Sequence, residues 1–252
     1  MSHGSIDPGH APSAAGVWHY WLGGKDYWRI EQEAGDAVAA SYDRIGAYAR
    51  NSRAWMMRAV RYAARTLGHD RFLDMGAGLP TDHNTHEIAA AEQPDVRTLY
   101  VDIDPRVVMH QDAMGDGRRR VEALEADMRD TDTVVAAARR HLGLTRPVAV
   151  LFSDCLGHLH DTGEAIGAVQ RLVAHLPSGS HLLLSHSTSS SETPYERVRY
   201  TARPPETIRR FFDGLEMVEP GLVSVQDWHP DGNTPTDEDL HESTYAGVAR
   251  IP

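Results

Sequence analysis

Cysteine, lysine and long apolar runs are almost absent from this sequence of 252 residues. The single cysteine, Cys155, excludes an internal disulfide and any cysteine-rich metal site, and we expect it to be a small buried side chain. No segment approaches the roughly 20 apolar residues of a membrane span, and the start MSHGSIDPGHAPS lacks the basic and apolar stretches of a signal peptide. We therefore expect a cytoplasmic protein without a membrane partner.

Basic charge is scarce as well, since 25 basic residues stand against 36 acidic ones and give a net charge of -11. A protein that wraps a nucleic acid obtains most of its affinity from cationic contacts to phosphates. The composition therefore predicts that no nucleic acid is a partner.

Histidine is plentiful, with 15 residues, and raises the question of a metal site. His83 and His86 have an i, i+3 spacing that suits ligands on a helix, but they lack a third ligand, and no H-E-x-x-H motif occurs. The pair His158 and His160 is the other candidate. We expect scattered surface histidines and no metal.

The amino-terminal third divides into a tail and a helical segment. Residues 1–16 are rich in Gly, Pro, Ser and His and predict a disordered tail, with order beginning near Val17. The aromatic stretch that follows, around Gly23-Gly24, predicts a short helix, a turn and a second helix, and a further break is expected near 41–44. We expect residues 17–68 to form an N-terminal helical lid or cap and residues 69–252 to form the cofactor-binding domain.

Strands and helices then alternate. The predicted strands span 71–76, 98–104, 120–127, 147–154 and 180–188, and the predicted helices begin near Pro80 or span 105–114, 131–142, 166–176 and 205–214. The segments 222–228 and 244–251 predict a closing antiparallel hairpin. This pattern is typical of a mostly parallel, doubly wound α/β sheet of six or seven strands.

A row of acids and glycines stands where the first three strands end. Asp74 precedes the turn Gly76-Ala77-Gly78, whose glycines allow the backbone to approach a ligand. Asp102 ends the second strand, where its carboxylate can accept hydrogen bonds from ribose hydroxyls, and Asp127 ends the third. The row predicts a nucleoside-bearing cofactor at the carboxyl edge of the sheet.

Three interpretations of the glycine turn remain at this point: S-adenosylmethionine, a nicotinamide dinucleotide, or structural glycines without a ligand. Thr81 stands where the dinucleotide pattern G-x-G-x-x-G needs its third glycine. Asp74, beside the turn, would repel a pyrophosphate but can pair with the ammonium of a methionine moiety. Both details favour S-adenosylmethionine.

The chain resembles the actinobacterial S-adenosyl-L-methionine-dependent methyltransferase family formerly classified as domain of unknown function 574. The resemblance covers about residues 12 to 250 and is carried by YWLGGKDYW, FLDMGAGLPTDHNTHEIA, YVDIDPRVV, ADMRD, RPVAVL and YAGVARI. It implies a Rossmann-like class I methyltransferase fold with a seven-stranded sheet, an antiparallel C-terminal strand and an N-terminal helical lid.

The resemblance also implies where the cofactor lies. On the sheet side it implies contacts with Gly76, Ala77, Gly78, Asp102, Ile103, Asp127 and Met128. From the amino-terminal segment it implies that the following residues close over the cofactor: Tyr20, Gly23, Gly24, Lys25, Arg50 and Asn51.

The chain departs from this family after RPVAVL. The family continues with an apolar strand and Leu-His-Phe, whereas this chain has FSDCLGHLHD, so Gly157 stands at the family's histidine. Polar Ser153 and Asp154 stand at the mouth of the fourth strand, and we count Ser153 among the candidate cofactor contacts.

Methyl transfer is an in-line displacement in which an enzyme contributes mainly alignment and desolvation, so a general base is optional. The candidate catalytic residues are His158, His160 and Tyr20. Each also has a structural interpretation, since the two histidines can line a polar loop and Tyr20 can be a hydrophobic cap residue.

Other side chains carry similar alternatives. His186 can act as a base or hydrogen-bond the backbone, and His19 is a further candidate in the cap. Trp18, Trp21 and Trp28 predict either an aromatic wall for a planar or cationic acceptor or a staple between cap and sheet.

The expected function is S-adenosylmethionine-dependent methylation of a small-molecule acceptor, such as a specialised metabolite, by a protein that can form a homodimer. The alternative is a catalytically inactive S-adenosylmethionine-binding protein with a regulatory or scaffold role. Turnover discriminates between the two.

Overall fold

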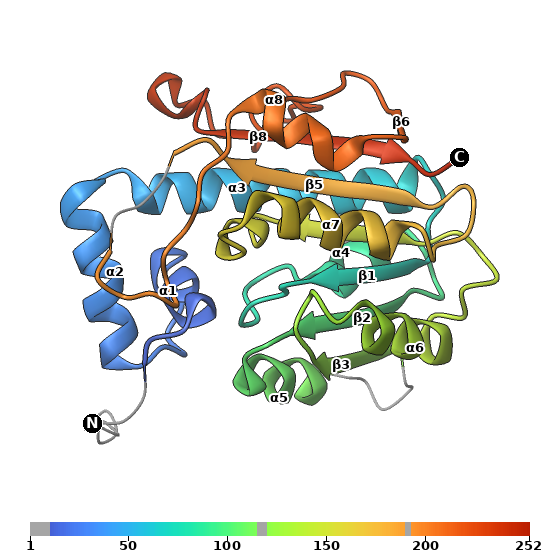
Figure 1. Cartoon of the computed structure of the whole chain (residues 1–252), viewed down its shortest axis with the longest axis horizontal. Helices are drawn as coiled ribbons and strands as arrows, with labels where there is room; N and C mark the ends of the chain where they lie inside the picture. Colours follow the sequence, from blue (N-terminus) through green and yellow to red (C-terminus); the bar gives the residue numbers. More distant parts are fainter. Residues whose placement is uncertain (1–10, 115–119, 190–192) are drawn as a thin grey trace.

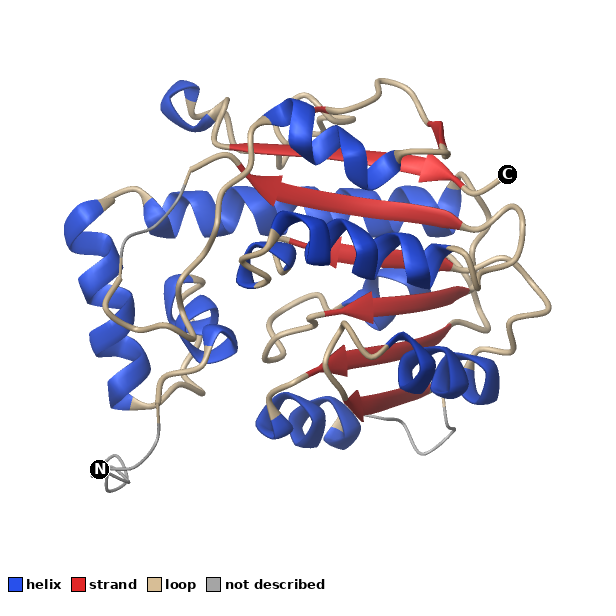
Figure 2. Cartoon of the chain, viewed as in Figure 1, coloured by secondary structure: helices blue, strands red, loops and turns tan. Residues whose placement is uncertain are grey.

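The strands form one mixed sheet in the order β3-β2-β1-β4-β5-β8-β6, with β7 paired to β8 (Figures 1 and 2). The computed structural model describes residues 11–114, 120–189 and 193–252, so the predicted tail residues 1–10 lie outside the described residues. Strands β1 to β5 are parallel, and β8 is antiparallel to β5. This is the expected Rossmann-like arrangement, and the described residues form eight strands rather than six or seven because the two-residue strand β6 was not predicted.

The element bounds follow the predicted alternation. The strands are β1 (Arg71–Met75), β2 (Arg97–Asp102), β3 (Val121–Glu125), β4 (Ala149–Ser153), β5 (His181–Ser187), β6 (Glu216–Met217), β7 (Val223–Ser224) and β8 (Thr244–Arg250). The α-helices are α1 (Ala14–Trp21), α2 (Arg29–Ser41), α3 (Ile45–Arg65), α4 (Thr85–Ala90), α5 (Pro105–Ala113), α6 (Thr131–His141), α7 (Thr162–Val173) and α8 (Pro205–Arg209). The short 3₁₀ helices are η1 (Leu156–His158), η2 (Arg210–Phe212) and η3 (Glu238–Leu240).

Two hydrophobic clusters cover opposite faces of the sheet because successive strand side chains alternate in direction. In β4, Val150 and Phe152 pack in the cluster that contains α6, α7 and α8, whereas Ala149 and Leu151 pack in the cluster that contains α3 and α4. Figure 2 shows α3 behind the sheet and α7 in front of it. The apolar run of the fourth strand is therefore buried on both faces, as predicted.

Two helices begin at other positions than the sequence pattern predicts. α1 begins at Ala14, earlier than Val17, because the Ser13 hydroxyl accepts a hydrogen bond from the Gly16 N–H (3.1 Å) and caps the helix. α4 begins at Thr85, later than Pro80, because Asn84 and Glu87 form a capping box. The signal N-x-x-E was present in the sequence.

α3 connects the amino-terminal segment to the sheet. Its second half, including Trp55 and Val60, packs with Phe72 of β1 and Leu183 of β5 in one buried cluster. α1 and α2 lie instead beside the carboxyl ends of β1 to β3 (Figure 1). We call α1 and α2 the cap helices. In the part of the chain that the structure describes, no helix is long and apolar enough to cross a membrane.

A buried histidine pair ties the amino ends of β1 and β5 together. His69 Nε2 and His181 Nδ1 are 2.8 Å apart, and the two residues are nearly inaccessible to solvent. Burial lowers the pKa of His69 to about 4 and also lowers the pKa of His181. The folded protein therefore holds both rings neutral at neutral pH.

This pair predicts a loss of stability in mild acid. Between the unfolded-state pKa of His69, near 6.5, and its folded-state pKa, about 4, the unfolded chain binds more protons, so the free energy of unfolding falls as pH falls. The contribution of His69 across this window is about 3 kcal/mol. We expect His69→Gln, which cannot titrate, to show a shallower decline between pH 7 and pH 4.5 in urea unfolding.

The matched control is His175→Gln, because His175 is exposed. This variant should retain the steep decline of the unaltered protein. An equally steep decline in His69→Gln would contradict the assignment.

Candidate functional site

The glycine turn lies between the carboxyl ends of β1 and β2. Gly76 and Gly78 have φ values of 66° and 69°, in the left-handed region that favours glycine. The Gly76 N–H donates to the Val101 carbonyl (2.8 Å), and the Gly78 N–H donates to Asp102 Oδ2 (2.9 Å). A Cβ atom on Gly76 would lie 2.5 Å from Cys155 Cβ. The turn therefore needs glycine at this close approach, and it brings Gly76, Ala77, Gly78 and Asp102 together.

Two buried carboxylates flank the turn. Asp74 accepts a hydrogen bond from Thr85 Oγ1 (2.6 Å), and burial raises the pKa of Asp74 to about 6. Asp102 also accepts from the Asp104 N–H (2.9 Å), and burial raises the pKa of Asp102. Ile103, the next residue, is 66% exposed. Ile103 thus presents an apolar side chain to solvent beside these two acids, and an aromatic ring can pack against it.

The third and fourth strand ends complete the edge. Asp127 Oδ2 pairs with Arg129 Nη2 at 2.5 Å, and this hydrogen bond lowers the pKa of Asp127. Met128 is partly buried beside Gly76, 3.6 Å from where a Cβ on that glycine would stand. Ser153 ends β4 half-buried, in register with Ser185 of β5.

The first half of α3 crosses this edge. Ser52 Oγ donates to Asp154 at the end of β4, and Arg53 Nη2 donates to the His83 carbonyl (3.0 Å) beyond the glycine turn. Asn51, the residue before Ser52, is 1% exposed. Among the described residues, neither the amide nitrogen nor the amide oxygen of Asn51 has a hydrogen-bond partner. Because buried polar groups are usually paired, both atoms remain available for a further partner.

Arg53 is a residue that the sequence analysis missed. Burial lowers the pKa of its guanidinium, and the negative charge of Asp74 opposes that effect. A half-buried cation thus lies within electrostatic reach of the Asp74 carboxylate. No sequence pattern distinguishes Arg53 from neighbouring arginines, and the predicted residue Arg50 is exposed to solvent.

The glycine pair of the cap forms the predicted turn after α1. Gly23 has a φ value of 82°, and a Cβ on Gly24 would lie 2.0 Å from His19 Nε2. The Lys25 N–H donates to His19 Nε2 (3.1 Å), while the Lys25 side chain is exposed. Burial lowers the pKa of His19, whose Nδ1 is another buried atom without a hydrogen-bond partner in the described ranges.

A fully buried carboxylate joins the cap helices to the sheet domain. Glu31 of α2 accepts hydrogen bonds from Ser13 Oγ (2.9 Å), the Trp28 N–H (2.8 Å) and Arg106 Nη2 of α5 (2.5 Å). Arg106 also pairs with Asp104 (3.0 Å), close after Asp102 in sequence. We call Glu31 and Arg106 the latch. It holds the cap helices next to the end of β2.

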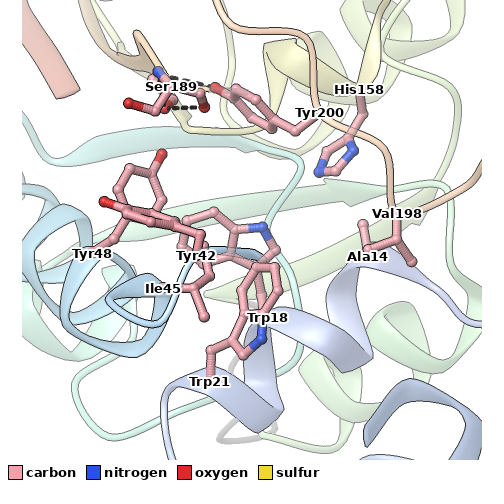
Figure 3. Close-up of a pocket in the computed structure, with 11 residues that line it drawn as sticks. Ala14, Trp18, Trp21, Tyr42, Ile45, Tyr48, His158, Ser189, Val198 and Tyr200 are labelled. Carbon is pink, nitrogen blue, oxygen red and sulfur yellow. Dashed lines mark hydrogen bonds between the residues drawn. The ribbon is translucent and has the colours of Figure 1, made fainter. Parts of the chain in front are cut away.

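A cavity lies between the cap and the connection from β5 to α8 (Figure 3). Eleven residues line it: Ala14, Trp18, Trp21, Tyr42, Ile45, Tyr48, His158, Ser187, Ser189, Val198 and Tyr200. The rings interlock, with centroids 5.8 Å apart for Trp18 and Trp21 and 5.9 Å apart for Trp18 and Tyr48. The enclosed volume is about 20 Å³, roughly one water molecule, so a larger occupant needs α1 or the connection to move.

His158 is the predicted catalytic residue that lines this cavity. Its Nδ1 lies 3.1 Å from the Arg199 carbonyl, which can only accept, so Nδ1 carries the proton and Nε2 keeps a lone pair. Burial lowers the pKa of His158 to about 4, so the ring is neutral at neutral pH.

The other two predicted catalytic residues lie outside the cavity lining. His160 Nδ1 lies 3.0 Å from Thr201 Oγ1, and the Tyr20 hydroxyl donates to Asp36 of α2 (2.6 Å). Trp28 also lies outside it, since its ring stacks under the Arg106 guanidinium at 3.7 Å. Of the three tryptophans singled out in the sequence, Trp18 and Trp21 line the cavity.

A buried polar network lies next to the cavity and hydrogen-bonds two of the tyrosines that line it. Asp154 is 2% exposed, and its carboxylate accepts hydrogen bonds from Ser52 Oγ, the Tyr200 hydroxyl (3.1 Å) and the Tyr48 phenol. Burial raises the pKa of Asp154. Tyr48 and Tyr200, two of the rings that line the cavity, are therefore held through their hydroxyls by the same carboxylate.

His186 belongs to the same network and hydrogen-bonds a backbone carbonyl. Its Nδ1–H donates to the Ser187 carbonyl (2.8 Å), and its Nε2 accepts from Arg203 Nη1 (2.7 Å). Burial lowers the pKa of His186 to about 3. Arg203 also donates to the Leu156 and Leu159 carbonyls (3.1 and 2.6 Å) on either side of His158. Both nitrogens of His186 are thus occupied, and Arg203 fixes the backbone that carries His158.

The departure at Gly157 has a structural counterpart in Tyr200. A Cβ on Gly157 would lie 2.2 Å from Tyr200 Cζ, so the tyrosine ring fills the space of a side chain at position 157. His158 and Tyr200 meet edge to face, with centroids 5.5 Å apart. Within the described ranges no group of three His, Cys, Asp or Glu side chains is placed to hold a metal ion.

Comparisons with known proteins agree with this geometry. A family model described as S-adenosyl methyltransferase matches residues 2–252. A search of curated proteins finds no match. A crystal structure of a DUF574 family protein from Streptomyces avermitilis is 36% identical, with a TM-score of 0.88 over 96% of this chain and 98% of that one.

Two further structures are similar. A putative methyltransferase from Thermobifida fusca is 31% identical, with a TM-score of 0.85 over 98% of this chain and 99% of that one. The sugar N-methyltransferase KedS8 from Streptoalloteichus is 17% identical, with a TM-score of 0.53 over 99% of both chains, and shares the fold.

The latch predicts which helices loosen first. Glu31→Gln removes the charge that pairs with Arg106, and we expect the cap helices to lose about 1 to 3 kcal/mol of local stability. In hydrogen exchange, amides of α1 and α2 should exchange faster, while those of β1 should not change.

The control is Glu33→Gln on the same helix, which removes the exposed pair between Arg29 and Glu33 (2.8 Å). Exposed pairs contribute little, so exchange should stay as in the unaltered protein. Equal effects of the two substitutions would refute the role given to the latch.

Proposed function

The chain belongs to the S-adenosyl methyltransferase family, and on that premise we propose that it transfers a methyl group from S-adenosylmethionine to a small molecule bound in the aromatic cavity. The observation that carries this proposal is the position of β4. On one side of its carboxyl end lie the glycine turn and Asp102, and beyond it η1 carries His158 into the cavity. A cofactor at the turn and an acceptor in the cavity would thus meet at the end of β4.

The residues at the edge fit this cofactor. Asn51, whose two polar side-chain atoms have no partner among the described residues, offers a donor and an acceptor, and Arg53 offers a cation for the cofactor's carboxylate. Asp74 is suited to its ammonium group. Asp102 can accept from the ribose hydroxyls, and Ile103 can cover the adenine ring.

The remaining predicted contacts belong to the same proposal. On the sheet side they are Gly76, Ala77, Gly78, Asp127, Met128 and Ser153, and in the amino-terminal segment they are Tyr20, Gly23, Gly24, Lys25 and Arg50. We propose that residues 17–68 act as a cap and residues 69–252 as the binding domain. Buried His19 Nδ1, without a partner among the described residues, supports a ligand under this cap.

S-adenosylmethionine supplies a methyl group on a sulfonium centre. The chain itself supplies alignment and exclusion of water: the rings of Trp18, Trp21 and Tyr48 enclose the acceptor, and Arg203 and the Arg199 carbonyl orient His158. His158 Nε2 then accepts a hydrogen bond from the acceptor. His160 and Tyr20 lie outside the cavity and contribute through His158 and the cap.

The ribose contact gives the first test. We expect Asp102→Ala to weaken binding of S-adenosylhomocysteine by about 1.5 to 3 kcal/mol, because charge-assisted hydrogen bonds are lost. Asp95→Ala, at the other end of β2, should bind as the unaltered protein does. Calorimetry measures both. Unchanged affinity in a folded Asp102→Ala variant, or binding of NAD alone, would refute the assignment.

Catalysis gives the second test. With labelled S-adenosylmethionine and fractions of an actinobacterial metabolite extract, we expect S-adenosylhomocysteine to accumulate, and His158→Gln to slow this about 10²-fold without weakening cofactor binding. His160→Gln is the matched control and should slow it much less. Absence of turnover with every fraction would favour the scaffold or regulatory alternative.

A further inference from the structure

Among the residues that the structure describes, the cavity lining holds no group that could neutralise an anion. Its eleven residues include no arginine, lysine, aspartate or glutamate, and His158 is neutral. Taking a carboxylate or phosphate out of water without a paired cation is costly. Acceptors that carry their anionic group into the cavity are therefore disfavoured.

Several features of the same cavity suit a positive charge. Trp18, Trp21, Tyr42, Tyr48 and Tyr200 surround it, and the negative faces of such rings attract cations. Behind two of these rings lies the buried Asp154 carboxylate, which contacts the hydroxyls of Tyr48 and Tyr200. The whole chain has a net charge of -11.

The charge of the reacting pair decides which acceptor gains from these features. When an uncharged amine is methylated by a sulfonium, one positive charge persists and moves from sulfur to nitrogen. When a phenolate is methylated, the charges cancel as the bond forms. Aromatic faces and a nearby carboxylate stabilise the positive charge that persists during amine methylation. They do not stabilise the transition state of phenolate methylation in this way, because its charges cancel.

His158 has the matching geometry. With Nδ1–H held by the Arg199 carbonyl, Nε2 can receive one N–H of an acceptor and so direct the lone pair of its nitrogen. Burial lowers the pKa of this imidazole to about 4, which makes it a good hydrogen-bond acceptor but a weak base for an alcohol.

We propose that the acceptor is a primary or secondary amine on an aromatic or apolar frame, which binds among the cavity rings once α1 moves to admit it and donates an N–H to His158 Nε2. This inference rests on the proposed function. In the step itself the amine nitrogen forms the N–C bond with its lone pair while the S–C bond breaks and leaves its electron pair on sulfur. The resulting ammonium loses its proton to water when the product leaves.

Binding is tested first, on protein saturated with S-adenosylhomocysteine and at about pH 9, where part of each amine is uncharged. The probes are two matched sets: tryptamine, tryptophol and indole-3-propionate, and phenethylamine, 2-phenylethanol and 3-phenylpropionate. We expect each amine to bind at least about ten-fold more tightly than its alcohol and carboxylate partners. Comparable binding of an alcohol or carboxylate, or no binding of either amine, would overturn the proposal.

Variants of Trp18 then test the source of the preference. Trp18→Leu keeps an apolar wall without a π face, and Trp18→Phe keeps the face. We expect Trp18→Leu to lose several-fold in amine affinity with little change for the alcohols, and Trp18→Phe to retain the preference. Equal losses for amine and alcohol would place the preference outside the rings and contradict the proposal.

Transfer is tested last, with S-adenosylmethionine and the amines that bind. Detection of the N-methyl product by mass spectrometry supports the proposal, and a bound amine that is not methylated overturns it. Calorimetry with S-adenosylhomocysteine alone distinguishes failure of this inference from failure of the proposed function. If the cofactor product binds and the amines fail, only this inference fails, whereas absence of cofactor binding would overturn the proposed function with it.

Discussion

The buried ion pair between Glu31 and Arg106 is the contact on which the geometry of the site depends. A carboxylate with no solvent exposure is tolerated only because it is fully paired, and its partners come from the start of α1, the start of α2 and α5. Since α1 carries Trp18 and Trp21, this pair sets one wall of the cavity relative to the end of β2. Gly16 is part of the same constraint, because a Cβ there would lie 2.0 Å from the Glu31 carboxylate.

The opposite wall depends on a second set of buried polar contacts. The connection from β5 to α8 supplies Tyr200 and Arg203, which reach Asp154, His186 and the backbone around His158. Val198 of this connection packs with Val17 and Ala34 of the cap. The cavity is thus built from segments up to 186 residues apart in sequence, from Ala14 to Tyr200, and each wall is held by its contact with the other. Its small enclosed volume follows from that contact.

Four histidines of the chain have different roles because their ring nitrogens have different partners. His69 and His181 bond to each other at the amino edge of the sheet, His186 is occupied at both nitrogens, and His158 keeps one lone pair toward the cavity. All four are held neutral by burial. Only the partner of each ring nitrogen separates a structural histidine from one that can touch an acceptor, and those partners lie on other elements of the fold.

The sequence by itself determined the fold class and the edge of the sheet where the glycine turn and Asp102 meet, because strand periodicity and turn chemistry are local properties of the chain. The family resemblance added Asn51 and the cap. Only the tertiary structure decided which side chains converge: it brought Arg53 to the Asp74 side, put His158 and not His160 in the cavity, and joined Trp18 to Tyr48 and Tyr200. These choices depend on packing between distant segments and on the burial that shifts pKa values, and neither is encoded at fixed spacing along the chain.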